Sequence, residues 1–133
     1  MNLSKTILFA IAHTCLGGRL TFYGPVPDGF SYSSDPGPWA PTYGSCGFED
    51  IPDHNYFVAI SAADYADGSL CGKCAKISFE GRTSIGPIAD KCPGCPSGGL
   101  DVSFHMMTEL AGSAERANFL GTIDVTYEII ECG

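Results

Sequence analysis

The sequence predicts a mainly β domain: a small barrel of roughly six short strands with one short helix, held by three disulfides. The chain has 133 residues, which fits one domain. Its 17 glycines and 9 prolines are typical of short strands joined by turns. Several short apolar runs also have strand length, and in the clearest of them Ile123, Val125, Tyr127 and Ile129 alternate with polar residues.

The first residues have the layout of a secretory signal peptide. Lys5 precedes the apolar run 6–12, and small residues follow at Gly17 and Gly18. We therefore expect a signal peptide over residues 1–18, a single domain over residues 19–133, and a secreted, extracellular protein. A buried first strand or helix remains the alternative for this segment.

The strands are expected between turn signals, at 19–23, 57–60, 74–79, 83–89, 100–102 and 122–130. Pro87 has no N–H for a sheet, so the fourth of these is expected at an edge or in an irregular stretch. Residues 62–66 are expected to form one helical turn. Ser103 can cap a helix over residues 104–111 that ends at Gly112. The Gly- and Pro-rich segment 24–45, which contains Trp39, is expected to be a loop.

The cysteines predict disulfides. Seven are present, and removal of Cys15 with the signal peptide leaves six: Cys46, Cys71, Cys74, Cys92, Cys95 and Cys132. An even number in a small exported domain predicts three disulfides, with 15 possible pairings. The alternative is a four-cysteine zinc ribbon, because two Cys-x-x-Cys pairs are 17 residues apart. His54 and His105 have no ligand-spaced partner and are expected at the surface, so we expect no metal and no cofactor.

The charge limits the partners. Fifteen acidic residues against seven basic ones give a net charge of −8. This excess of acid argues against nucleic acid, anionic membranes and polyuronates as ligands. A neutral glycan or a protein surface is favoured, and we expect a monomer.

Four segments in order resemble the double-psi β-barrel family of expansins, barwin-type proteins and rare lipoprotein A. They are Thr21-Phe22-Tyr23-Gly24, Cys71-Gly72-Lys73-Cys74, Ala89-Asp90-Lys91-Cys92-Pro93-Gly94-Cys95 and Leu100-Asp101-Val102-Ser103. The resemblance spans residues 19–132 and is greatest to the single-barrel loosenin type. It implies a six-stranded double-psi barrel with a shallow groove. It also implies disulfides between Cys46 and Cys71, Cys74 and Cys132, and Cys92 and Cys95.

The same resemblance implies the site. Asp101 corresponds to the general acid of the related family 45 glycoside hydrolases, but Pro25 stands where those enzymes carry the catalytic base. Ordinary hydrolysis is therefore not expected, and the chain is predicted not to be an enzyme. Asp101, Asp90, Tyr23 and Thr21 correspond to polar groove positions, whereas Cys92 replaces a groove tyrosine of the family.

Three functions follow from this resemblance. The first is non-hydrolytic binding of a neutral wall polysaccharide, such as cellulose, chitin or peptidoglycan. The second is inhibition of papain-like cysteine proteases. The third is a lytic transglycosylase-like reaction that uses Asp101 alone, for which burial would have to raise the pKa of Asp101. Purely structural roles remain open for the site residues: a cap for Asp101, ordering of the Cys92–Cys95 loop for Asp90, and barrel packing for Tyr23.

Overall fold

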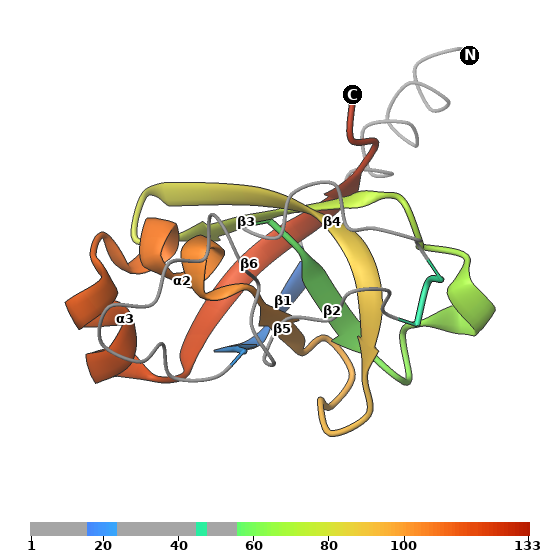
Figure 1. Cartoon of the computed structure of the whole chain (residues 1–133), viewed down its shortest axis with the longest axis horizontal. Helices are drawn as coiled ribbons and strands as arrows, with labels where there is room; N and C mark the ends of the chain where they lie inside the picture. Colours follow the sequence, from blue (N-terminus) through green and yellow to red (C-terminus); the bar gives the residue numbers. More distant parts are fainter. Residues whose placement is uncertain (1–15, 24–44, 48–55) are drawn as a thin grey trace, which may run out of the picture.

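The computed structural model describes residues 16–23, 45–47 and 56–133 and shows a closed six-stranded barrel (Figure 1). Going round the barrel, the strands follow the order β1-β5-β2-β4-β3-β6. Their bounds are β1 Leu16–Phe22, β2 Val58–Ser61, β3 Cys74–Phe79, β4 Arg82–Cys92, β5 Leu100–Val102 and β6 Ile123–Ile130. The predicted mainly β barrel is confirmed.

Two of the six strand pairs are parallel. These are β1 with β5 and β2 with β4, whereas the remaining neighbours are antiparallel. Parallel partners cannot be joined by a tight turn, so each of these pairs links segments far apart in the sequence. In this arrangement β2 lies between β5 and β4, and β1 lies on the other side of β5.

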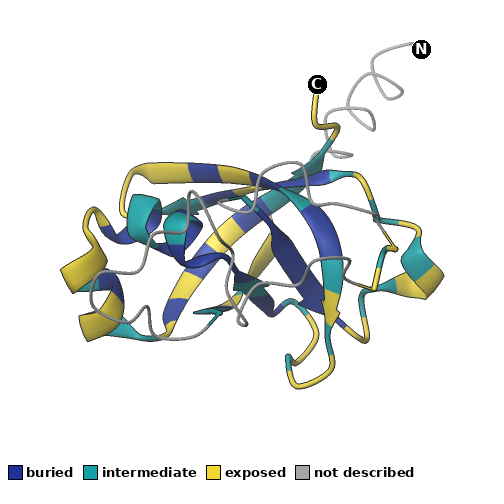
Figure 2. Cartoon of the chain, in the orientation of Figure 1, coloured by how far each residue is buried: buried dark blue, intermediate teal, exposed yellow. Residues whose placement is uncertain are grey.

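Alternating apolar residues fill the barrel. Ile123, Val125 and Tyr127 of β6 are buried, and the residues between them are exposed, as predicted (Figure 2). The same alternation places Leu20 of β1 and Leu100 of β5 in the interior cluster. Side chains alternate between the two faces of a strand, so the residues next to these face outward.

β4 is longer than predicted, and Pro87 does not lie at a sheet edge. Residues Arg82 to Pro87 pair with β3, and the strand then continues beside β2 from Ile88 to Cys92. Pro87 lies where β4 changes its partner, so the chain tolerates the missing N–H at this point. Of the two predicted alternatives, the edge position was wrong because a closed barrel has no edge. The irregular stretch is present, because the pairing of β4 with β2 shifts register directly after Pro87, between Ile88 and Asp90.

The helix α2, Phe104–Ala111, agrees with the prediction. The Ser103 side chain accepts a hydrogen bond from the Met106 N–H, and Gly112 ends the helix with a left-handed backbone at φ 95°. A second helix, α3, Ala114–Leu120, was not predicted. It begins at Ser113 and buries only Ala117, so it lacks the apolar stripe by which helices are found in a sequence. The short helical turn also lies later than predicted, at Ala66–Gly68.

All three predicted disulfides are present: Cys46–Cys71, Cys74–Cys132 and Cys92–Cys95. Each cysteine of the two Cys-x-x-Cys pairs is therefore already bonded. The alternative of a four-cysteine zinc ribbon is wrong.

β1 begins at Leu16, so three residues before the predicted domain boundary pair with β6. Gly18 lies tightly against the backbone of Gly98, where an added Cβ would be 1.9 Å from the carbonyl oxygen. Residues 1–15 lie outside the described part of the chain, and the signal peptide stays a prediction. Within the described ranges, no helix is long and apolar enough to cross a membrane.

Candidate functional site

Four residues from four strands form a row across the outer face of the barrel. Thr21 pairs with Asp101, Asp101 with Ala59, and Ala59 with Asp90. Because directly paired residues project from the same face of a sheet, these four side chains share one face. We call Thr21, Asp101, Ala59 and Asp90 the carboxylate row.

The row faces away from the barrel interior because its sequence neighbours face inward. Leu20, Leu100 and Ile60 each precede or follow a row residue and belong to the interior cluster. Ala59 is fully buried without belonging to that cluster. This small side chain separates the two carboxylates, whose Cα atoms are two strand spacings, about 10 Å, apart.

Asp101 has an unsatisfied oxygen. Its Oδ1 is buried and has no hydrogen-bond partner among the described residues. Burial raises the pKa of the Asp101 carboxyl, and the negative charge of Asp90 raises it further, while a hydrogen bond from Thr21 opposes both effects. An unpaired carboxylate oxygen with a raised pKa is typical of ligand-binding and catalytic positions.

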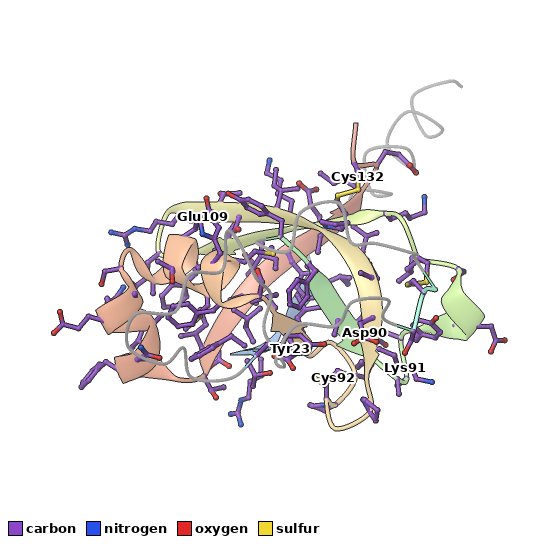
Figure 3. The ribbon with its side chains drawn as sticks, in the orientation of Figure 1. Tyr23, Asp90, Lys91, Cys92, Glu109 and Cys132 are labelled. Atoms are coloured by element: carbon purple, nitrogen blue, oxygen red, sulfur yellow. A yellow bond between two sulfur atoms is a disulfide. The ribbon has the colours of Figure 1, made fainter. Side chains whose placement is uncertain are left out.

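In Asp90, unlike Asp101, both carboxylate oxygens accept hydrogen bonds. Its Oδ2 accepts a hydrogen bond from the Tyr23 hydroxyl at 3.1 Å, and its Oδ1 accepts from the backbone N–H groups of Ser45 and Lys91, each at 2.8 Å. Figure 3 shows Tyr23, Asp90 and Lys91 close together at one end of the barrel. Asp90 thus ties β4 to β1 and to the segment that carries Cys46.

Tyr23 keeps its proton. Burial, the nearby charges of Asp90 and Asp101, and the hydrogen bond to Asp90 all raise the pKa of its phenol far above the usual value. Its ring packs edge-on against Phe57, with 4.9 Å between the ring centroids. The hydroxyl and one ring edge are therefore occupied within the protein, which favours a positioning role for Tyr23 over sugar stacking.

Next to the row, the loop that contains Cys92 and Cys95 is fixed by Asp64. The Asp64 carboxylate accepts hydrogen bonds from Gly98 N–H at 2.6 Å and from the hydroxyls of Ser97 and Ser61, both at 2.8 Å. These contacts hold the pKa of Asp64 below its usual value. Asp64 could not be recognised from the sequence, because its partners Ser97 and Gly98 lie more than 30 residues further along the chain.

A second polar cluster lies between α2 and β4, away from the row. The Glu109 carboxylate accepts hydrogen bonds from the Ser84 hydroxyl at 2.7 Å and from the Tyr56 hydroxyl at 3.1 Å. His105 Nε2 lies 3.1 Å from the same Tyr56 oxygen, and the His105 ring packs edge-on against Tyr56. His105 was predicted at the surface but is half-buried, and His54 lies outside the described residues.

The row contains three of the four residues expected to bind substrate, Thr21, Asp90 and Asp101. The fourth, Tyr23, lies beside the row and donates a hydrogen bond to Asp90. In the described ranges, no three side chains of the His, Cys, Asp and Glu types are grouped as a metal site would need. A shallow depression on α3, lined by Ser113, Glu115, Arg116 and Phe119, contains none of the predicted site residues. The site residues that the sequence missed are Ala59 and Ser45.

Several proteins of known structure have the same fold as this chain. The expansin of Clavibacter michiganensis matches 90% of this chain and 52% of its own, with a TM-score of 0.66 and 24% identity. The Streptomyces papain inhibitor matches 89% of this chain and 96% of its own, with a TM-score of 0.62 and 26% identity. The chain has the double-psi β-barrel fold of the expansin-like proteins. A cerato-platanin of M. perniciosa also has this expansin-like barrel, with a TM-score of 0.56 and 23% identity over 87% of this chain and 95% of its own.

Sequence comparison adds two curated relatives of this chain. Allergen Asp f 7 of Aspergillus fumigatus is 33% identical over 94 residues, which cover 71% of this chain and 30% of the allergen. The papain inhibitor of Streptomyces mobaraensis is 35% identical over 75 residues, 52% of each protein. The chain thus spans about half or less of the length of these relatives. No family model matches the sequence.

Proposed function

We propose that this protein is an extracellular, non-hydrolytic binder of neutral cell-wall polysaccharide, and that the glycan contacts the carboxylate row. The single observation that carries the proposal is the buried Asp101 Oδ1 without a partner among the described residues. A carboxylate oxygen accepts hydrogen bonds, and sugar hydroxyls donate them. A mutant of the Clavibacter michiganensis expansin, which has the same fold, was solved in complex with cellohexaose.

The charge of the chain supports an uncharged ligand. At a net charge of −8, anionic polymers are repelled, whereas a neutral glycan is not. The row itself contributes two carboxylates within two strand spacings of each other, which adds to the local negative potential.

The partners of Asp90 argue against hydrolysis. An inverting glycosidase needs a second carboxylate that activates water, and this carboxylate must be free to take the proton. Asp90 accepts three hydrogen bonds from Tyr23, Ser45 and Lys91, so its oxygens are used to hold the fold. Pro25, predicted at the position of the base, lies outside the described residues, and its role stays a prediction.

The test is retention on insoluble cellulose, chitin and peptidoglycan, with an assay for released sugars in the supernatant. We expect retention without soluble product, and weaker retention for Asp101→Asn. Asp124→Asn is the matched control, because Asp124 is an exposed carboxylate on the outer face of β6. Equal retention of all three proteins would overturn the role of Asp101, and no retention on any polymer would overturn the function.

The second candidate is inhibition of a papain-like cysteine protease. It is favoured by the 35% identity over 75 residues to the Streptomyces mobaraensis papain inhibitor. Inhibition of papain that survives Asp101→Asn would support this candidate. Sugar release that disappears in the same variant would instead support the lytic transglycosylase-like reaction.

A further inference from the structure

The Cys92–Cys95 disulfide closes a much shorter loop than the other two disulfides do. Cys92 ends β4 and Cys95 follows three residues later, whereas the other pairs are 25 and 58 residues apart. A disulfide that closes a shorter loop restricts the unfolded chain less. Breaking Cys92–Cys95 should therefore cost the least folding stability of the three.

The loop is also held in place without its disulfide. On one side, the Ala62 N–H donates to the Cys92 carbonyl at 3.1 Å. On the other side, Gly98 is fixed through its N–H to Asp64 and through its carbonyl to the Tyr127 hydroxyl at 3.0 Å. Both ends of the loop would thus keep their positions if the sulfur–sulfur bond were opened.

The residues of this loop are partly exposed to solvent. Cys92 and Cys95 are half-buried, and Pro93 and Gly94 between them are exposed. In Figure 3, Cys92 lies beside Asp90 and Lys91 and far from Cys132.

We propose that Cys92–Cys95 is a thiol–disulfide exchange site that reacts reversibly with low-molecular-weight thiols and dithiols while the barrel stays folded. A thiolate of the reductant attacks one sulfur and forms a mixed disulfide with it, and the other cysteine leaves as a thiolate. A second thiol then attacks the reductant sulfur of this mixed disulfide. The products are an oxidised reductant and two cysteine thiols, a transfer of two electrons.

The test treats the oxidised, folded protein with increasing dithiothreitol, traps free thiols with iodoacetamide, and locates the labels by peptide mass spectrometry. We expect Cys92 and Cys95 to be labelled about tenfold sooner than the other four cysteines. Near-ultraviolet circular dichroism should be unchanged at that stage. Removal of the reductant in air should restore the disulfide.

Earlier reduction of a different disulfide would contradict the proposal. Cys132 is exposed, so the Cys74–Cys132 bond is the alternative first target. If Cys74 and Cys132 are labelled first, or if all six cysteines are labelled together as the circular dichroism is lost, the proposal is wrong.

Two variants separate exchange from unfolding. Cys92→Ser/Cys95→Ser should fold and show no labelling at the dithiothreitol concentration that labels the wild type. The control is Cys46→Ser/Cys71→Ser, which removes a disulfide between cysteines 25 residues apart. It should lower the Tm more than Cys92→Ser/Cys95→Ser does. If the control lowers the Tm less than the Cys92→Ser/Cys95→Ser pair does, the proposal is overturned. The result does not depend on whether the protein binds polysaccharide.

Discussion

Glu109 and Asp101 are both half-buried carboxylates, yet their surroundings differ. Glu109 has a hydrogen-bond donor on each oxygen, Ser84 on Oε1 and Tyr56 on Oε2. Asp101 has a buried Oδ1 with no partner among the described residues. A buried carboxylate with full hydrogen bonding stabilises the fold, whereas an unsatisfied one costs folding free energy. The difference separates a carboxylate that is fully satisfied within the fold from one that is not.

The first prediction removes the satisfied carboxylate. Glu109→Ala leaves the buried Ser84 hydroxyl without its acceptor and removes one contact of the Tyr56 hydroxyl. We expect it to lower the free energy of unfolding by about 2–3 kcal/mol. Urea unfolding measures this change. Glu115→Ala is the control, since Glu115 is exposed on α3, and we expect it to change the free energy of unfolding by less than about 0.5 kcal/mol. Equal effects of the two variants would show that the Glu109 contacts contribute nothing.

The second prediction concerns the link between Tyr23 and Asp90. Tyr23→Phe removes the donor to Asp90 Oδ2 and should lower the free energy of unfolding by about 1 kcal/mol. A double-mutant cycle with Asp90→Asn isolates the contact, and we expect a coupling of about 0.5–1 kcal/mol. Simple additivity of the two substitutions would mean that the hydrogen bond does not stabilise the folded state.

The third substitution is expected to raise the free energy of unfolding, whereas the first two lower it. Asp101→Asn removes a charge that is costly to bury, so we expect it to raise the free energy of unfolding at pH 7, by about 0.5–1 kcal/mol. The same variant should bind polysaccharide more weakly. A variant that is destabilised to the same extent as Glu109→Ala would show that Asp101 is structural, and the comparison would fail.

The fourth prediction concerns how the stability gained by Asp101→Asn depends on pH. Because folding raises the pKa of Asp101, the protonated carboxyl stabilises the folded state below the unfolded pKa, and this contribution is lost as the pH rises through the folded pKa. The Tm advantage of Asp101→Asn should therefore shrink as the pH falls from 7 to below about 4, the usual pKa of an aspartate. Thermal unfolding of both proteins across this range measures it. An advantage that grows in acid would contradict a raised pKa.

The sequence predicted the parts of the fold that depend on local patterns. The alternation in β6, the turn after Phe79 and the Ser103 cap all act over a few residues, and each is present in the structure. The disulfide pairing came from the resemblance to expansins. The signal peptide and the substrate contacts remain predictions.

Other features depend on distant contacts and could not be predicted. Asp90 was expected to bind substrate or to order its loop, but its donors Tyr23 and Ser45 are 67 and 45 residues away. Ala59 became part of the site only because β2 lies between β4 and β5. Pattern analysis of one segment contains no information on which strand will lie beside it.

The position of β1 has a consequence for how the protein is made. β1 closes the barrel by pairing with β6, so Leu20 lies opposite Ile123. Of the described strands, β1 is made first and β6 last, so β1 cannot form this pair until β6 has been made. We expect the barrel to remain open during synthesis and to close only after β6 has emerged. Until then, the apolar face of β1 is exposed to solvent and to any chaperone that binds it.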